Sequence, residues 1–110
     1  MNTRILGDGV VAEIAYKGWR DKRTKETWVV RGDCSQLLAS PESKIKFDWG
    51  CSGKKPLYLA FAIAEDYLGN IEKAAKVHQK FNSKIIANLD LDDWHLSTQF
   101  LDRVFSELDK

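Results

Sequence analysis

The sequence lacks a hydrophobic run long enough to cross a membrane as a helix. Its most apolar stretch runs from Leu57 to Ala64, far short of the roughly 20 residues that a membrane-spanning helix needs. The first residues, MNTRILGDGV, contain no apolar core of signal-peptide length. We therefore expect a cytoplasmic protein in which residues 57–64 belong to a buried helix.

Cysteine and net charge are also scarce. Cys34 and Cys51 form neither a CxxC motif nor a Cys/His metal spacing, so in a reducing compartment we expect free thiols and no metal site. Lys and Arg number 17 against 16 Asp and Glu, so the charge gives no overall attraction to nucleic acid or anionic membranes. No cofactor motif is present. The length of 110 residues fits one domain, 1–110, with residues 1–8 expected to be flexible.

Alternating apolar and polar residues predict short strands in the N-terminal half. A first strand is expected at about residues 9–18, and the returning strand at 27–31 contains aromatic and β-branched side chains. Residues 20–26 contain no apolar side chain and are predicted to form the hairpin loop between them. Ile45, Phe47 and Trp49 alternate with polar residues and predict a third strand.

Two segments are harder to assign. Leu37 and Leu38 can plug the edge of the core from a short turn, and the SPES sequence at 40–43 is typical of a loop. Residues 90–96 are predicted to form a connection that carries Trp94.

Helix-start and helix-stop residues divide the C-terminal half into helices. Pro56 at the first position and Gly69 past the end delimit a helix over residues 56–68. Because this helix is apolar on nearly all faces, we expect other elements to surround it. Asn70 is a good N-cap for a second helix that can kink or divide at 82–83. Its apolar face is expected to contain Ala74, Val77, His78, Phe81, Ile85 and Leu89.

A last helix begins after Ser97 or Thr98. If Ser97 is its N-cap, Leu96 and Leu101 occupy the positions of a hydrophobic staple. Its buried face is expected to contain Phe100, Leu101, Val104, Phe105 and Leu108. Strands followed by helices predict an α+β fold, in which a small antiparallel sheet of about three strands in the N-terminal half packs against about three helices in the C-terminal half.

The stretch WGCSGKKPLYLAFAIAEDYLG, followed by HQKF and Trp94, resembles a family of small uncharacterised bacterial and phage domains with the signature Trp-Gly-Tyr-x-Gly-x-Gly-Pro-x-x-Leu-Ala. The earlier YKGWR resembles the family's Tyr-x-Gly-x-Arg start. The chain departs from the pattern at Cys51, Lys54 and Lys55. Positions that match are Phe47, Trp49, Gly50, Gly53, Pro56, Leu59 and Ala60. The resemblance implies a phage or mobile-element context and no particular activity.

The glycine-containing loop before residue 56 is a candidate anion site. Backbone N–H groups at a helix N-terminus, with two lysines nearby, can hold an anion. The spacing is not that of a P-loop, and a tight turn between strand and helix explains the glycines better, because GxxG alone is weak evidence for phosphate binding. The candidate residues are Gly50, Ser52, Gly53, Lys54 and Lys55.

Other polar residues allow weaker hypotheses. Cys51 at a helix N-terminus beside Lys54 can have a lowered thiol pKa, as a nucleophile requires, but no general base can be placed near it. His78 and His95 fit no metal signature. The acidic residues Asp90, Asp92 and Asp93 lack the ligand pattern of an EF-hand, and a solvated loop explains them better.

The predicted hairpin has the composition of a nucleic-acid contact. Its cations are Arg20, Lys22, Arg23 and Lys25. Trp19 and Trp28 flank them and can stack on bases. Asp21 and Glu26 dilute the positive charge, and a solvated hairpin tip explains these residues better.

The sequence has four tryptophans, which either build a core or offer a surface to a partner. Trp19, Trp28 and Trp94 are the candidate interaction residues. Small size and the absence of a recognisable catalytic set favour a non-enzymatic protein-interaction module. The alternatives are an anion or nucleic-acid binder that uses residues 50–55 and 20–25, and an enzyme, which would need a pocket that joins Cys51 or His78 to another polar group.

Overall fold

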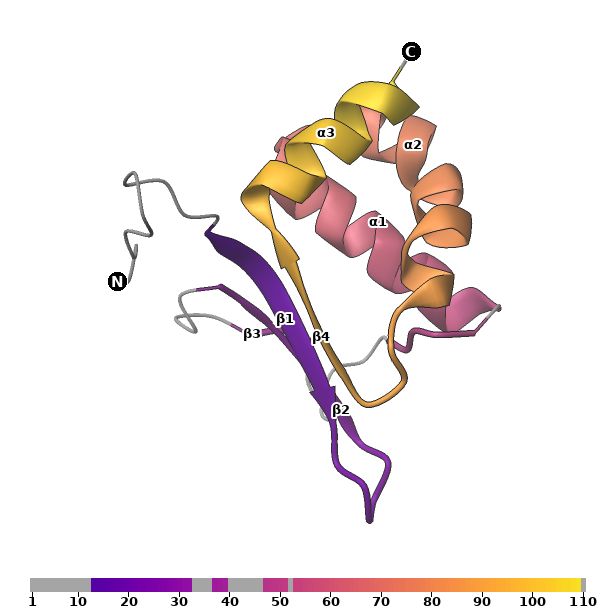
Figure 1. The fold of residues 1–110 in the computed structure, drawn as a ribbon. Coiled ribbons are helices and arrows are strands. Elements are labelled where there is room, and N and C mark those ends of the chain that lie inside the picture. The colour runs from indigo at the N-terminus through magenta and orange to yellow at the C-terminus, as the bar shows by residue number, and fades with distance from the viewer. Residues whose placement is uncertain (1–12, 33–36, 40–46, 52, 110) are drawn as a thin grey trace.

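The computed structural model describes residues 13–32, 37–39, 47–51 and 53–109 of the chain. A four-stranded antiparallel sheet carries the helices on one side (Figure 1). Three of the strands come from the N-terminal part and three α-helices from the C-terminal part. The predicted α+β class is therefore confirmed.

The sheet has the strand order β3-β2-β1-β4. Its centre is the predicted hairpin of β1 (Ile14–Arg20) and β2 (Thr27–Arg31), in which Trp19 lies opposite Trp28. The edge strands are β3 (Leu37–Ala39) and β4 (Asp93–Ser97). The expected start of the first strand, before residue 13, lies outside the described residues, as does the segment expected to be flexible.

The predicted third strand is wrong over its described part, residues 47–49, which join no sheet. The backbone of this segment forms hydrogen bonds outside the sheet. The N–H of Trp49 donates to Asp48 Oδ1 over 2.8 Å, and the N–H of Gly50 donates to the carbonyl of Ile86 over 2.9 Å. The third strand of the N-terminal part is β3, where we expected a turn at residues 37–38.

Residues 93–97, most of which were predicted as a connection, form strand β4 beside β1. Trp94 and Leu96 are buried, whereas Asp93 before them and His95 between them are exposed. This is the alternation of a strand with one buried face. Its partner strand β1 is far away in sequence, so a segment from the C-terminal part of the chain forms one edge of the sheet.

The helices are α1 (Lys54–Leu68), α2 (Ile71–Lys84) and α3 (Thr98–Leu108). Asn70 accepts a hydrogen bond from the N–H of Lys73 over 2.9 Å, and Ser97 accepts one from that of Phe100 over 3.1 Å. Both predicted N-caps are therefore confirmed. Gly69 ends α1 at φ 67°, in the left-handed region. No helix in the described part of the chain is long and apolar enough to span a membrane.

Two helix boundaries differ from the expected ones. Helix α1 begins at Lys54, so Pro56 lies within the first turn, where its missing N–H still costs no helical hydrogen bond. The second helix ends at Lys84, and a short 3-10 helix, η1 (Ile86–Asn88), follows it. The Asn88 amide donates to the carbonyls of Ser83 and Lys84, which close the last turn of α2.

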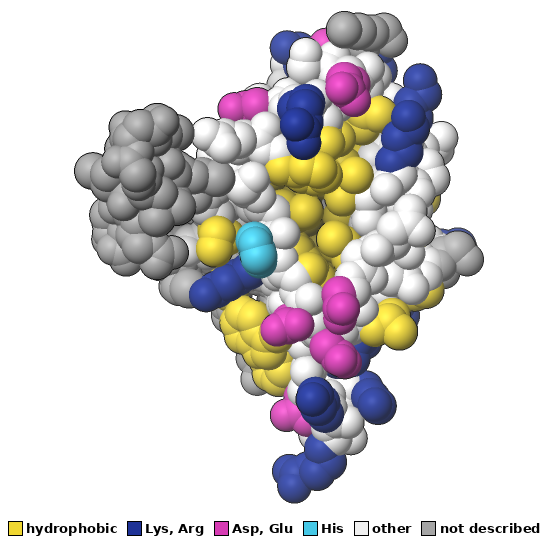
Figure 2. Space-filling view, viewed as in Figure 1, with side chains coloured by type: hydrophobic (Ala, Val, Ile, Leu, Met, Phe, Trp, Pro, Cys, Tyr) yellow, Lys and Arg dark blue, Asp and Glu magenta, His cyan; other side chains and the backbone are white. Residues whose placement is uncertain are grey.

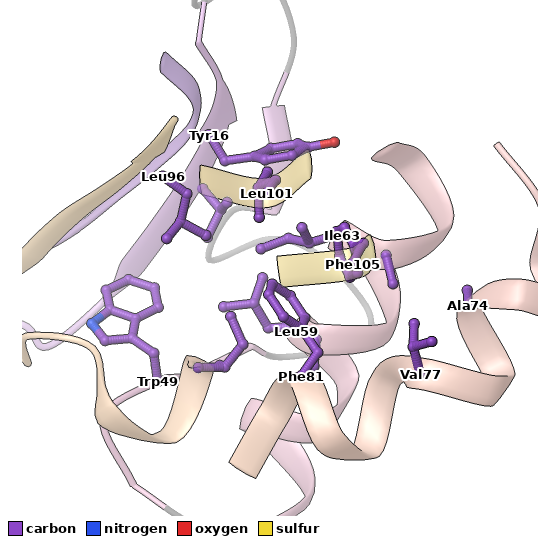
Figure 3. Packing of buried hydrophobic residues seen from close by; sticks show 14 of the residues in the cluster. Tyr16, Trp49, Leu59, Ile63, Ala74, Val77, Phe81, Leu96, Leu101 and Phe105 are labelled. Carbon is purple, nitrogen blue, oxygen red and sulfur yellow. The ribbon is translucent and has the colours of Figure 1, made fainter. Parts of the chain in front are cut away.

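The core lies between the sheet and the helices. Leu59, Phe81 and Phe105 meet near its centre (Figure 3) and are almost fully buried. Helix α1 contributes five buried residues, but its Tyr58 is 44% exposed. The expectation that other elements surround α1 on all sides is therefore wrong, because one face of this helix reaches solvent.

Candidate functional site

Two tryptophans lie on the outer face of the sheet, the face turned away from the helices. Trp19 and Trp28 are cross-strand neighbours, with ring centroids 5.9 Å apart and ring planes 11° apart. Trp19 remains 38% exposed. Such a stacked pair presents a rigid aromatic surface at little cost in side-chain entropy.

Trp19 forms one wall of a hollow of about 710 Å³ over β1 and β4, which we call the tryptophan trough. In the sheet register Trp19 faces Asp93, and Lys17 faces His95. The residues that line the trough are Ile14, Lys17, Gly18, Trp19, Asp90, Asp93, Trp94 and His95. The trough therefore combines apolar surface with charges of both signs.

The tip of the hairpin is basic. Lys22, Arg23 and Lys25 are all exposed, and Figure 2 shows Lys and Arg side chains gathered at this end of the molecule, with acidic side chains close by. The carboxylate of Asp21 accepts hydrogen bonds from the N–H groups of Arg23 and Thr24, which lowers the pKa of Asp21. The tip is thus a folded turn that displays three cations.

Arg20, the fourth predicted basic-surface residue, is part of the fold. Its guanidinium lies 2.7 Å from Asp48 Oδ1, and its Nε donates to the carbonyl of Leu91 over 2.8 Å. It also stacks over the Trp49 ring, 5.0 Å from the centroid, with only 15% of its side chain exposed. Arg20 therefore has little charge to offer a ligand.

The residues of the candidate anion site do not form a preorganised pocket with the hairpin cations. Gly50 uses its N–H within the fold, and a Cβ there would lie 2.7 Å from Leu91 Cδ2. Lys54 and Lys55 are exposed at the start of α1, which lies away from the hairpin tip in Figure 1. Gly53 is also exposed, and Ser52 lies outside the described residues.

The structure does not favour Cys51 as a nucleophile. Burial raises the pKa of its thiol, and the nearby Asp48 carboxylate raises it further, opposite to the lowering that a nucleophile would require. His78 turns its Nδ1 toward the carbonyls of Ala74 and Ala75 on its own helix. Among the described residues no group of three or more His, Cys, Asp or Glu is placed to hold a metal ion. Cys34 lies outside the described residues.

The other two tryptophans belong to the core. Trp49 and Trp94 meet edge to face, with centroids 5.4 Å apart, and Trp94 is only 8% exposed. A Cβ on Gly18 would lie 2.6 Å from the Trp94 ring, so the glycine allows this ring to pack against β1. Of the three candidate interaction residues, Trp94 therefore has the least surface to offer.

A second hollow, of about 420 Å³, lies between α2 and α3, where Figure 2 shows a strip of hydrophobic side chains. Tyr67 donates a hydrogen bond to Asp102 Oδ1 over 2.5 Å at its rim. Burial and this bond raise the pKa of Tyr67 to about 12, so the hydroxyl stays protonated at neutral pH. Val77 and Phe105 in this hollow are nearly fully buried, whereas Tyr67 and Leu68 are partly exposed.

Sequence reasoning missed most of the trough. Lys17 lies on the same strand as Trp19, but Asp93 and His95 join them only because β4 pairs with β1, and that pairing was not predicted. The available signal was the alternation of Trp94 and Leu96 with polar neighbours.

These features define a small α+β domain with an exposed aromatic trough. The model of a family of unknown function, DUF6166, matches residues 16–107, and the chain belongs to this family. No curated protein matches the chain, and no solved structure does. The match begins at Tyr16, whose strand carries both the buried Gly18 and the exposed Trp19.

Proposed function

We propose that this protein is a non-enzymatic protein-interaction module that binds its partner at the tryptophan trough. The observation that supports the proposal is the exposed Trp19, held by its stack on Trp28 in a hollow of mixed charge. Tryptophans at the centre of an interface often contribute much of the binding energy, because they bury a large area with few rotatable bonds.

The trough also indicates the chemistry of the partner. Lys17 and Asp93 lie on the two strands that form it, so a complementary surface would bring an apolar side chain to Trp19 and charges of both signs to its flanks. Because the chain resembles small bacterial and phage domains, we propose a bacterial host protein that this domain modulates.

Single-stranded nucleic acid is the second candidate ligand. The basic tip lies at the end of the same hairpin as Trp19 and Trp28, an arrangement that suits base stacking with phosphate contacts. Against this, Asp90 and Asp93 line the trough beside Trp19 and would repel a phosphate chain. Lys54 and Lys55 lie elsewhere. The charges beside Trp19 therefore favour a protein partner.

An affinity capture from host lysate, with and without nuclease, distinguishes the two ligands. The variants are Trp19→Ala and a hairpin variant with Lys22, Arg23 and Lys25 changed to Gln. Ile71→Ala is the matched control, since Ile71 is exposed and does not line the trough. We expect a nuclease-resistant protein that the hairpin and control variants retain and Trp19→Ala loses. Nucleic acid recovered with the wild type and lost with the hairpin variant would reject the proposal.

A further inference from the structure

The exposed face of α1 forms a second, separate surface. A hollow of about 440 Å³ lies along it, and we call this surface the α1 groove. It shares no lining residue with the tryptophan trough. Its lining is largely apolar: Phe47, Leu57, Tyr58, Phe61, Ala62 and His78. Glu65 completes it at one end.

The α1 groove is ordered along the helix by charge. Lys54, Tyr58, Phe61 and Glu65 follow one another at intervals of three and four residues, so they share the face opposite to the buried Ile63. Lys54 and Glu65 are exposed at the two ends of this face, with the aromatic residues between them. Read along α1, the surface is positive, then apolar, then negative.

This order is complementary to itself. If a second α1 lies antiparallel across the first, a twofold axis passes near Tyr58 and Phe61 and brings Lys54 of each chain to Glu65 of the other. Such a twofold interface uses the same patch on both subunits, as most homodimers do. A partner with the same charge order in a parallel arrangement would instead bring like charges together.

His78 supports the apolar centre from α2. A carbonyl oxygen cannot donate a hydrogen, so the Nδ1 facing the carbonyls of Ala74 and Ala75 carries the proton. The ring lies edge to face on Phe61, with centroids 5.2 Å apart. Phe61 is thus fixed by a neighbouring helix, and a rigid aromatic surface loses little entropy on binding.

We propose that the protein forms a twofold homodimer through its α1 grooves, with α1 antiparallel to α1 of a second copy. The contact face, from Lys54 to Glu65, is roughly 17 Å long and one helix wide, which is small for a stable interface. We therefore expect a reversible dimer that dissociates on dilution. The inference concerns a surface other than the trough and does not depend on the proposed function.

Sedimentation equilibrium over roughly 5–500 µM protein tests the proposal with a charge exchange. Lys54→Glu and Glu65→Lys each place like charges across the axis twice, and we expect each to weaken dimerisation about tenfold or more. The double variant Lys54→Glu/Glu65→Lys restores both pairs in the opposite sense, and we expect it to dimerise nearly as well as the wild type. Tyr58→Ala removes the apolar centre and should also dissociate the dimer.

Two controls keep the test specific. Glu72→Lys makes the same charge change at an exposed position of α2, and Trp19→Ala alters the trough. Both should leave the dimer unchanged, and circular dichroism establishes that every variant is folded. A wild type that stays monomeric at 500 µM overturns the proposal, and the α1 groove would then be a site for a different protein. A dimer that the single charge variants do not weaken, or that the double variant does not restore, also overturns it. Neither result affects the trough.

Discussion

Two arginines of one hairpin have different roles at the scale of single residues. Arg23 is exposed at the tip, whereas Arg20, three positions earlier, joins β1 to Asp48, to the carbonyl of Leu91 and to the Trp49 ring. The two segments that Arg20 joins to β1 are far apart in sequence. Its charge is used inside the molecule, and composition alone does not distinguish it from its neighbours.

We expect Arg20→Ala to lower the free energy of unfolding by about 2 kcal/mol, because it removes hydrogen bonds of a charged group and a cation–π contact. Arg23→Ala is the matched control and should change stability by less than about 0.5 kcal/mol. Urea unfolding at pH 7 measures both values. Equal effects of the two substitutions would show that Arg20 contributes no more than a surface arginine.

At the scale of elements, a polar cluster fastens α1 to the sheet. Tyr16 of β1 donates its hydroxyl to Asp66 of α1, and Arg31 of β2 pairs with the same carboxylate. The hydrogen bonds from Arg31 lower the pKa of Asp66, and burial together with the bond to Asp66 raises the pKa of Tyr16. At neutral pH the cluster therefore contains a charged Asp66 and a protonated Tyr16.

We expect this cluster to contribute to stability in a pH-dependent way. Because the pKa of Asp66 is lower in the folded chain than in the unfolded one, its contribution is complete above the unfolded value of about 4 and is lost as pH falls through the folded value. Asp66→Asn should lower the free energy of unfolding by about 1–3 kcal/mol at pH 7. The difference from wild type should shrink between pH 4 and pH 2.

Urea unfolding from pH 7 to pH 2 measures this dependence. Asp93→Asn is the control, because it removes one carboxylate from an exposed position outside the cluster. A difference between wild type and Asp66→Asn that stays constant down to pH 2 would contradict the assignment of the stabilisation to the charged form.

The elements differ in how well the sequence predicts them. Asn70, Ser97 and Gly69 act locally, through hydrogen bonds or dihedral angles within one turn, so the helix boundaries could be predicted to within a few residues. Strand pairing is not local. The short strand β4 has a readable alternation, but its place beside β1 depends on the packing of Trp94 over Gly18. The side of the trough that β1 forms, with Lys17 and Trp19, follows from the hairpin, and the Asp93–His95 side does not.

The chain order of the whole molecule interleaves its two layers. Strand β4 follows α1 and α2 in the chain but lies in the sheet. Helix α3 begins directly after it, at the cap residue Ser97. Together β4 and α3 supply Trp94, Leu96, Leu101 and Phe105 to the core. The sheet and the helices therefore cannot be separated into an N-terminal and a C-terminal folding unit.

We expect a fragment of residues 1–88 to be unfolded, since it lacks β4 and α3 and leaves the apolar side of α1 and β1 open to water. Far-UV circular dichroism of the fragment measures this loss, and the full chain is the control. In the full chain, tryptophan fluorescence and circular dichroism should give the same urea midpoint, because the two layers share one core. A fragment with its own cooperative transition, or two separate midpoints in the full chain, would show that the helices or the hairpin fold independently.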